Sequence, residues 1–134
     1  MELKKVVLRF LDGQVQPGYS PLCEDGLDTV FATDMSGMPS SIPLQDLKAV
    51  FFVRTFSGNP DYDAKRSPEE LAEFAGSNLV LLTFQDGERL VGEVRSGADL
   101  AKGFFLTVLD PNDNNILVYV NPYGLSRPPE SQDR

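Results

Sequence analysis

Apolar residues recur at every second position in two stretches of the chain, residues 6–10 and residues 80–84. A period of two places alternate side chains on the same face of a β-strand. Each stretch is soon followed by Asp-Gly, at residues 12–13 and 86–87. This dipeptide favours a tight turn, because glycine tolerates positive φ and aspartate hydrogen-bonds to its own turn backbone. The pattern therefore predicts a β-hairpin early in each half of the chain.

The two stretches are separated by a spacing of 74 residues, the difference between 86 and 12. At this spacing the chain matches itself without a gap, and a duplicated structural unit explains such a match. The alternative is that any two strand–turn–strand segments look alike. A later glycine lies within the second strand of each hairpin, where glycine marks a bulge or a sharp bend. The predicted turn and bend residues are Asp12, Gly13, Gly18, Asp86, Gly87 and Gly92, and the other matched pairs are Val6/Val80, Leu8/Leu82, Phe10/Phe84, Phe31/Phe105, Thr33/Thr107 and Ile42/Ile116.

Further short strands complete each half. We expect strands over residues 29–33 and 47–56 in the first half and over residues 103–109 and 116–121 in the second, about four per unit. The predicted fold class is mainly β, with two pseudo-repeated, strongly bent sheets or small barrels and one short linking helix. Residues 49–53 are apolar on both faces, which favours a strand buried between the halves. The alternative is an exposed edge that accepts a partner strand.

The segment between the halves carries a helix signature. Ser67 is placed to cap the helix, Pro68 suits its first position, Glu70 completes an S-x-x-E box and Gly76 ends it. We expect this helix to cover one end of the fold. The predicted domain plan is a first β repeat over residues 1–58, a linker with the helix over 59–77, a second β repeat over 78–125 and a polar tail over 126–134. We expect one compact unit whose tail is a loose end.

Acidic residues outnumber basic ones, which limits the expected partners. Twenty Asp and Glu against 12 Lys and Arg give a net charge of −8, which repels nucleic acid and anionic membranes. A single cysteine and the lack of histidine exclude an internal disulfide and a Cys/His zinc site. No apolar run has the length of a membrane span or of a signal-peptide core. We expect a cytoplasmic protein with no cofactor or metal, and with a protein partner or self-association.

The alternating run, the Asp-Gly turn and the later glycine, present in both halves, resemble the first sequence motif of Sm-like barrels. The resemblance implies Sm-like/SH3-like, five-stranded and strongly bent sheets that follow a helix, and the predicted helix over residues 68–75 precedes the second copy. Sm proteins that bind RNA also carry a later Arg-Gly pair, which neither half has. The resemblance therefore implies the barrel geometry and not RNA binding.

A second resemblance spans most of the chain. Residues 42–53 with 58–60, and residues 103–106 with 114–115, are similar to an uncharacterised family of bacterial domains. That family has no established activity. The resemblance implies the fold and a bacterial origin and transfers no site residue.

One loop has the residue types of a calcium site. Residues 110–115 place oxygen ligands at alternate positions, as a calcium loop does. Asn115 stands where such a loop requires glycine, and Asn121 stands where it requires a bidentate glutamate. The segment therefore predicts a hairpin turn rich in Asx residues.

Two other loops carry candidate chemistry. Glu24, Asp25 and Asp28 form an acidic cluster, and paired carboxylates perform acid–base chemistry when burial separates their pKa values. A solvated loop is the expected state of this cluster. Residues 34–38 resemble the Asp-x-Ser-x-x-Gly motif of PilZ barrels, which bind cyclic di-nucleotides. The glycine that ends this motif is absent after Met38, and no Arg-x-x-x-Arg precedes the first strand.

No set of residues converges on catalysis. The leading hypothesis is a non-catalytic binding or adaptor module that acts through protein–protein contacts. The alternatives are a PilZ-like cyclic-di-nucleotide sensing domain and an acid–base enzyme built on the acidic cluster. The possible partner surface comprises the edge strands and two loops, with residues Glu24, Asp25, Asp28, Asn112, Asn114 and Asn115.

Overall fold

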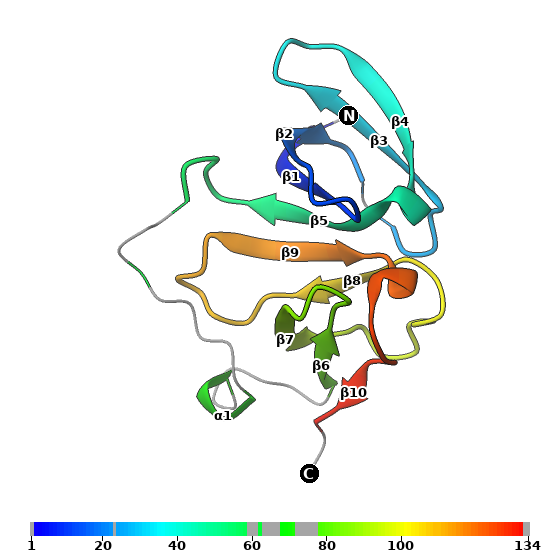
Figure 1. Cartoon of the computed structure of the whole chain (residues 1–134). Helices are drawn as coiled ribbons and strands as arrows, with labels where there is room; N and C mark the ends of the chain where they lie inside the picture. The colour runs from blue at the N-terminus through cyan, green and yellow to red at the C-terminus, as the bar shows by residue number, and fades with distance from the viewer. Residues whose placement is uncertain (1, 23, 59–61, 63–67, 72–77, 133–134) are drawn as a thin grey trace.

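A computed structural model of the chain describes residues 2–22, 24–58, 62, 68–71 and 78–132. Ten strands form one antiparallel sheet in the order β10-β6-β7-β8-β9-β5-β1-β2-β3-β4, which leaves two free edges (Figure 1). The mainly β class is confirmed, but the strands build one continuous open sheet rather than two separate ones. The strands are β1 (Lys4–Phe10), β2 (Val15–Ser20), β3 (Thr29–Asp34), β4 (Pro39–Pro43), β5 (Leu47–Val53), β6 (Leu79–Thr83), β7 (Arg89–Glu93), β8 (Phe104–Thr107), β9 (Asn115–Val120) and β10 (Glu130–Ser131).

The central strand β5 joins the first half of the chain to the second. It pairs with β1 on one side and with β9 on the other, and all seven of its residues are buried. In Figure 1, β5 and β9 cross the middle of the molecule, with β1–β4 above them and β6–β8 below. The expectation that residues 49–53 form a buried strand between the halves is confirmed, because both faces of β5 are covered.

Each half completes the hydrophobic core of the other. Phe51 and Val53 of β5 lie in the core formed mainly by β6–β9, whereas Val50 and Phe52 lie in the core formed mainly by β1–β3. Tyr119 of β9 is fully buried in that latter core. Successive side chains of a strand point to opposite faces, so one strand can serve two cores. The two halves therefore share buried side chains across the contact between β5 and β9.

The two predicted hairpin turns are confirmed and have the same geometry. In each turn the aspartate carboxylate accepts the backbone N–H two residues later, and the following glycine has positive φ, a conformation that is costly for other residues. The distances are 2.9 Å from Gln14 N to Asp12 Oδ1 and 2.9 Å from Glu88 N to Asp86 Oδ1, with φ of 94° at Gly13 and 91° at Gly87.

The second and third strands of each half approach so closely that glycine is required. A Cβ atom at Gly18 would lie 2.6 Å from the carbonyl oxygen of Thr33, and one at Gly92 would lie 2.5 Å from that of Thr107. Both distances are far below van der Waals contact. Any side chain at either glycine would push the two strands apart.

The strand register shows that the sequence offset between equivalent residues of the two halves changes after the third strand. Phe31 pairs with Ser41 and Phe105 with Tyr119, so the spacing is 74 between the phenylalanines and 78 between their partners. The β8–β9 hairpin therefore has four more residues between equivalent paired positions than the β3–β4 hairpin has. The gapless match of Ile42 to residue 116 is wrong, because by register residue 42 corresponds to residue 120.

Two strands were not expected from the sequence, β4 and β10. Residues 130–131 pair with residues 80–81 of β6, so the segment expected as a loose tail contributes a strand. Leu125 also bridges to Phe84 of the second half. Each half consequently has five strands rather than about four. Prolines in and before these strands conceal them in the sequence.

The short helix α1 (Pro68–Leu71) begins where the sequence predicted, and the rest of the predicted helix and most of the linker lie outside the described residues. Leu71 is buried against Leu79, Leu81 and Val91 of β6 and β7. Two 3-10 helices, η1 (Leu44–Asp46) and η3 (Pro122–Gly124), precede the last strand of each half. Among the described residues, no helix is long and apolar enough to cross a lipid bilayer.

Candidate functional site

A groove of about 570 Å³ lies between the two halves of the chain. Its floor is apolar and its rim is charged. Because strands of both halves line it, the groove exists only when β5 and β9 are paired. We call it the junction groove and define it by the floor residues Phe52, Phe105 and Leu117 and the rim residues Lys4, Glu24, Asp25 and Arg95.

Three neighbouring strands place the floor side chains. Phe52 comes from β5, Phe105 from β8 and Leu117 from β9. The ring centroids of Phe52 and Phe105 are 6.1 Å apart with the rings tilted, and Phe105 lies 4.8 Å from the ring of Tyr119. Tilted aromatic pairs at these distances stabilise one another. The floor is therefore a fixed apolar surface held by side chains on the rigid sheet.

Asp25 ties the loop between β2 and β3 to the second half of the chain. Its Oδ1 accepts the backbone N–H of Phe105 at 3.1 Å, and its Oδ2 accepts Nη2 of Arg95 at 2.8 Å. The predicted site residue Asp25 is thus at the groove, with both carboxylate oxygens occupied. A carboxylate bound in this way holds the loop in place at the rim of the groove.

The structure divides the predicted acidic cluster between two depressions. Glu24 and Asp25 line the junction groove, whereas Asp28 lines a second cleft of about 560 Å³ at the end of the sheet, beside Lys102 and Tyr123. The three carboxylates do not converge on one point. Within the part of the chain that the structure describes, no three Asp, Glu, Cys or His residues are grouped as a metal site.

The predicted asparagine loop connects β8 to β9 and forms hydrogen bonds between the two halves. The Asn114 side chain accepts the N–H of Thr55 at 3.1 Å and donates to the carbonyl oxygen of Thr55 at 3.0 Å. The expected Asx-rich turn is confirmed, but these residues do not join the acidic cluster. The other bonds of the turn are Asn112 N to Asp110 Oδ1 at 3.0 Å and Asn115 N to Asp113 Oδ1 at 2.8 Å.

The segment that resembles the PilZ motif forms the β3–β4 turn. The Asp34 carboxylate accepts hydrogen bonds from the N–H and hydroxyl of Ser36 and from the N–H of Met38, at 2.7 to 2.9 Å. These bonds, that of the Ser36 hydroxyl above all, hold the pKa of Asp34 below its ordinary value. The geometry is that of a self-contained hairpin turn.

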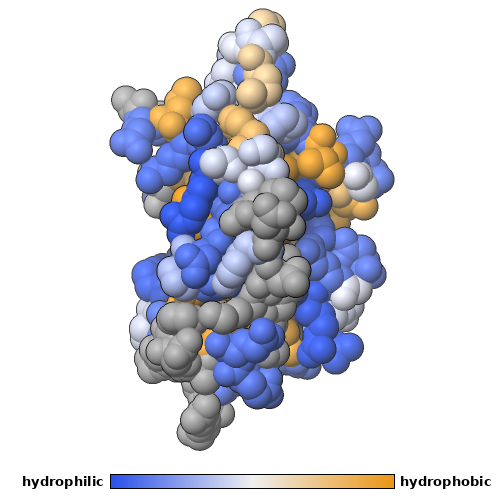
Figure 2. Space-filling model, turned by 90° about the vertical axis from the view of Figure 1, so that its left-hand side faces the viewer, coloured by the Kyte–Doolittle hydropathy of each residue, from blue (hydrophilic) through white to orange (hydrophobic). Residues whose placement is uncertain are grey.

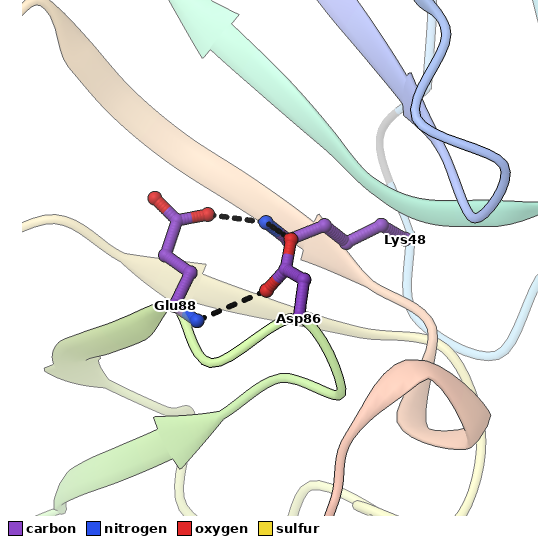
Figure 3. A network of polar contacts seen from close by, with 3 residues as sticks. All are labelled: Lys48, Asp86 and Glu88. Carbon is purple, nitrogen blue, oxygen red and sulfur yellow. Dashed lines mark hydrogen bonds and ion pairs between the residues drawn. The ribbon is translucent and has the colours of Figure 1, made fainter.

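A buried lysine that the sequence analysis did not single out links β5 to the second hairpin turn. Lys48 is 9% exposed, and its Nζ lies 2.7 Å from Oδ2 of Asp86 and in contact with Oε1 of Glu88 (Figure 3). The same Nζ lies 4.8 Å from the ring centroid of Phe84. The Lys48 ammonium holds the pKa of Asp86 below its ordinary value. In the sequence, the one indication of this buried lysine is its position within an apolar strand.

The chain was compared with protein families, curated proteins and solved structures. Neither the curated proteins nor the solved structures contain a match. One family model, described as a family of unknown function (DUF6982), matches residues 2–127. This match agrees with the resemblance to an uncharacterised domain family. Since the match covers nearly all of the chain, the protein belongs to this family of unknown function, DUF6982.

Proposed function

We propose that the protein is a non-catalytic binding module that holds a segment of a partner protein in the junction groove. The observation that carries the proposal is the groove itself, a concave apolar surface of about 570 Å³ with a few charged groups at its rim. Binding sites are typically concave and apolar, with a small number of placed polar groups. The groove has room for one large apolar side chain of a partner.

The rim favours a protein segment over a fully apolar ligand. Lys4 and Arg95 place positive charge at the rim, and Glu24 and Asp25 place negative charge there. An apolar centre within a polar rim is the usual anatomy of a protein–protein contact. Asp25 and Arg95 pair with each other, so Lys4 and Glu24 are the rim charges that suit the polar groups flanking an apolar anchor of a peptide.

We further propose that the two halves are copies of one five-stranded, Sm-like unit. Within the sheet the first half has the order β4-β3-β2-β1-β5 and the second half the order β9-β8-β7-β6-β10, which is the same order in chain sequence. The shared turn bonds at Asp12 and Asp86 and the close approaches at Gly18 and Gly92 support this proposal. On this view the groove forms where the fifth strand of one unit meets the fourth strand of the next.

Two neighbouring residues of β9 provide the test. Leu117 lines the groove, whereas Ile116 points to the opposite face of the strand and is 42% exposed. Peptides are selected from a displayed random library on the wild-type protein, and their affinities are measured by calorimetry. We expect the selected peptides to share a large apolar side chain. They should bind Leu117→Lys at least about tenfold more weakly than the wild type, because a central contact is lost, and should bind Ile116→Lys with unchanged affinity.

The proposal fails if no peptide is enriched, or if the two lysine variants bind the selected peptides equally well. Circular dichroism serves as the control that both variants fold. Titration with cyclic di-nucleotides under the same conditions tests the PilZ alternative. If a cyclic di-nucleotide binds with measurable heat, and Leu117→Lys leaves that binding unchanged, the PilZ alternative replaces the proposal.

A further inference from the structure

We infer that both edges of the ten-stranded sheet are closed to strand addition, so that the protein works as a single two-unit body and binds partners through side chains. An open sheet exposes a row of backbone N–H and C=O groups at each edge, and such an edge recruits further strands unless it is blocked. The free edges here belong to β4 and β10. Two prolines lie within β4 and two directly precede β10, and proline has no N–H to donate.

The hydrogen bonds of the β3–β4 hairpin show which β4 residues face outward. Asp34 N donates to Met38 O at 3.0 Å, and Leu44 N donates to Asp28 O at 2.8 Å. In an antiparallel ladder, bonded pairs alternate with non-bonded pairs. Counting inward from these two bonds, residues 40 and 42 bond to β3, and the backbone groups of residues 39, 41 and 43 point away from it.

Two of the three outward positions of β4 are proline. Pro39 and Pro43 lack an N–H, which leaves Ser41 as the one outward donor along the strand. A partner strand needs donors at alternate residues to form a ladder. The N–H groups of the β4 edge can therefore donate at most one hydrogen bond to an added strand.

The residues that make the contact between the halves are also absent from the β4 edge. Ser41 pairs with Phe31 and Tyr119 pairs with Phe105, so Ser41 corresponds to Tyr119. In the same way, residue 39 pairs with residue 33 and residue 117 with residue 107, so residue 39 corresponds to residue 117. This comparison rests on the proposed repeat. Serine and proline thus replace the buried tyrosine and the groove leucine. A third unit would find neither the donors nor the apolar surface that β9 offers to β5.

The opposite edge is blocked in the same manner. The strand β10 has only two residues and directly follows Pro128 and Pro129. Leu125 forms a bridge with Phe84 in the second half, and Leu47 pairs with Phe10 in the first half. Leu125 therefore corresponds to Leu47, and the next residue, Ser126, corresponds to Lys48 of β5. The buried ammonium that fastens β5 to the second unit has no counterpart at this edge. The contact between units is consequently made once in the molecule and is not repeated outward.

The closed edges direct a partner to side-chain surfaces. On the face seen in Figure 2, the coloured hydrophobic residues lie in separate patches between hydrophilic ones. The junction groove offers an apolar floor that needs no strand pairing. A partner therefore inserts a side chain instead of adding a strand.

A variant that restores the outward donors provides the test. Pro39→Thr/Pro43→Thr adds two N–H groups at the edge and removes no internal hydrogen bond, so the protein still folds. Pro111→Thr, in an exposed loop away from both edges, is the matched control. Sedimentation velocity reports association, and amide hydrogen exchange at residue 41 reports whether a strand covers the edge.

We expect wild type and the control to show exchange at residue 41 that does not depend on protein concentration, and the double variant to associate and protect that amide as concentration rises. Concentration-dependent protection of residue 41 in the wild type would overturn the inference. A folded double variant that stays monomeric, with unchanged exchange, would also overturn it. Peptide binding in the junction groove is measured separately and is expected to be unaffected by the double variant, so the two proposals fail independently.

Discussion

Replacing Lys48 by methionine tests the polar link between β5 and the second hairpin turn. Methionine keeps the length and apolar stem of the lysine and removes the ammonium group. The ammonium contacts the carboxylates of Asp86 and Glu88 and lies 4.8 Å from the ring centroid of Phe84. The substitution therefore deletes two ion pairs and one cation–π contact without opening a large cavity.

The expected loss of unfolding free energy follows from the exposure of the partners. The Lys48 side chain is 11% exposed, but those of Asp86 and Glu88 are 56% and 35% exposed. Water solvates these carboxylates when the lysine is gone, so each pair contributes about 0.2–1 kcal/mol, as surface pairs do. The cation–π contact adds about 0.5–1 kcal/mol. Burial of the methionine in place of the charge offsets part of the sum, which leaves a loss of about 1–2 kcal/mol near neutral pH.

The pH dependence separates charge from packing. The pKa of Asp86 is lowered in the folded protein, mainly by its hydrogen bond from Lys48. A lowered folded pKa contributes stability that is present above the unfolded value, near 3.8, and is lost as pH falls through the folded value. In urea unfolding, the stability difference between wild type and Lys48→Met should therefore be largest near neutral pH. As the pH falls below the pKa of an ordinary carboxyl group, it should shrink to the cation–π part, about 0.5–1 kcal/mol.

The two equivalent turns provide a matched control. Asp86→Asn should cost stability because it removes the partner of Lys48, whereas Asp12→Asn changes the first turn, whose aspartate has no ion pair among the described residues. Asparagine retains an acceptor for the turn N–H in both variants. A stability difference between wild type and Lys48→Met that stays constant with pH, or equal losses in the two asparagine variants, would refute the electrostatic account.

Two further predictions concern buried positions. Gly18→Ala and Gly92→Ala should each lose about 1–3 kcal/mol of unfolding free energy in urea, because the new Cβ collides with a carbonyl oxygen, and variants as stable as the wild type would contradict this reasoning. Burial raises the pKa of Tyr119 to about 12, so an ultraviolet titration of the folded protein should contain a tyrosine step near that pH that is missing in Tyr119→Phe. Because this folded pKa is raised, the stability that it contributes should fall as pH rises from about 10 to about 12.

The sequence predicted the elements whose signals are local. Alternation and Asp-Gly identified the hairpins at Gly13 and Gly87, and the apolar run over residues 49–53 identified the buried central strand, because strand periodicity and turn chemistry act over a few residues. The strands β4 and β10 were missed for the opposite reason. Proline argues against a central strand but is tolerated at an edge, and which strand is an edge depends on the whole sheet.

The candidate site was predicted in part. Glu24 and Asp25 were named from their charge, and both lie at the junction groove. Phe105 was noted only for its place in the repeat, and Lys48 was missed. Their roles arise from partners far away in the chain, such as Asp25 for Phe105, and no local pattern reports such contacts.

The sequence by itself determined that the chain is mainly β, where its turns and its central strand lie, and that its surface is acidic. These properties follow from side-chain period, glycine conformation and charge count, which are read residue by residue. Only the tertiary structure decided that the halves share one sheet, that β5 serves two cores, and that loop, strand and rim meet in one groove. Those features depend on the pairing of β5 with β9, a contact between residues more than 60 positions apart that lowers the free energy only once both halves have folded.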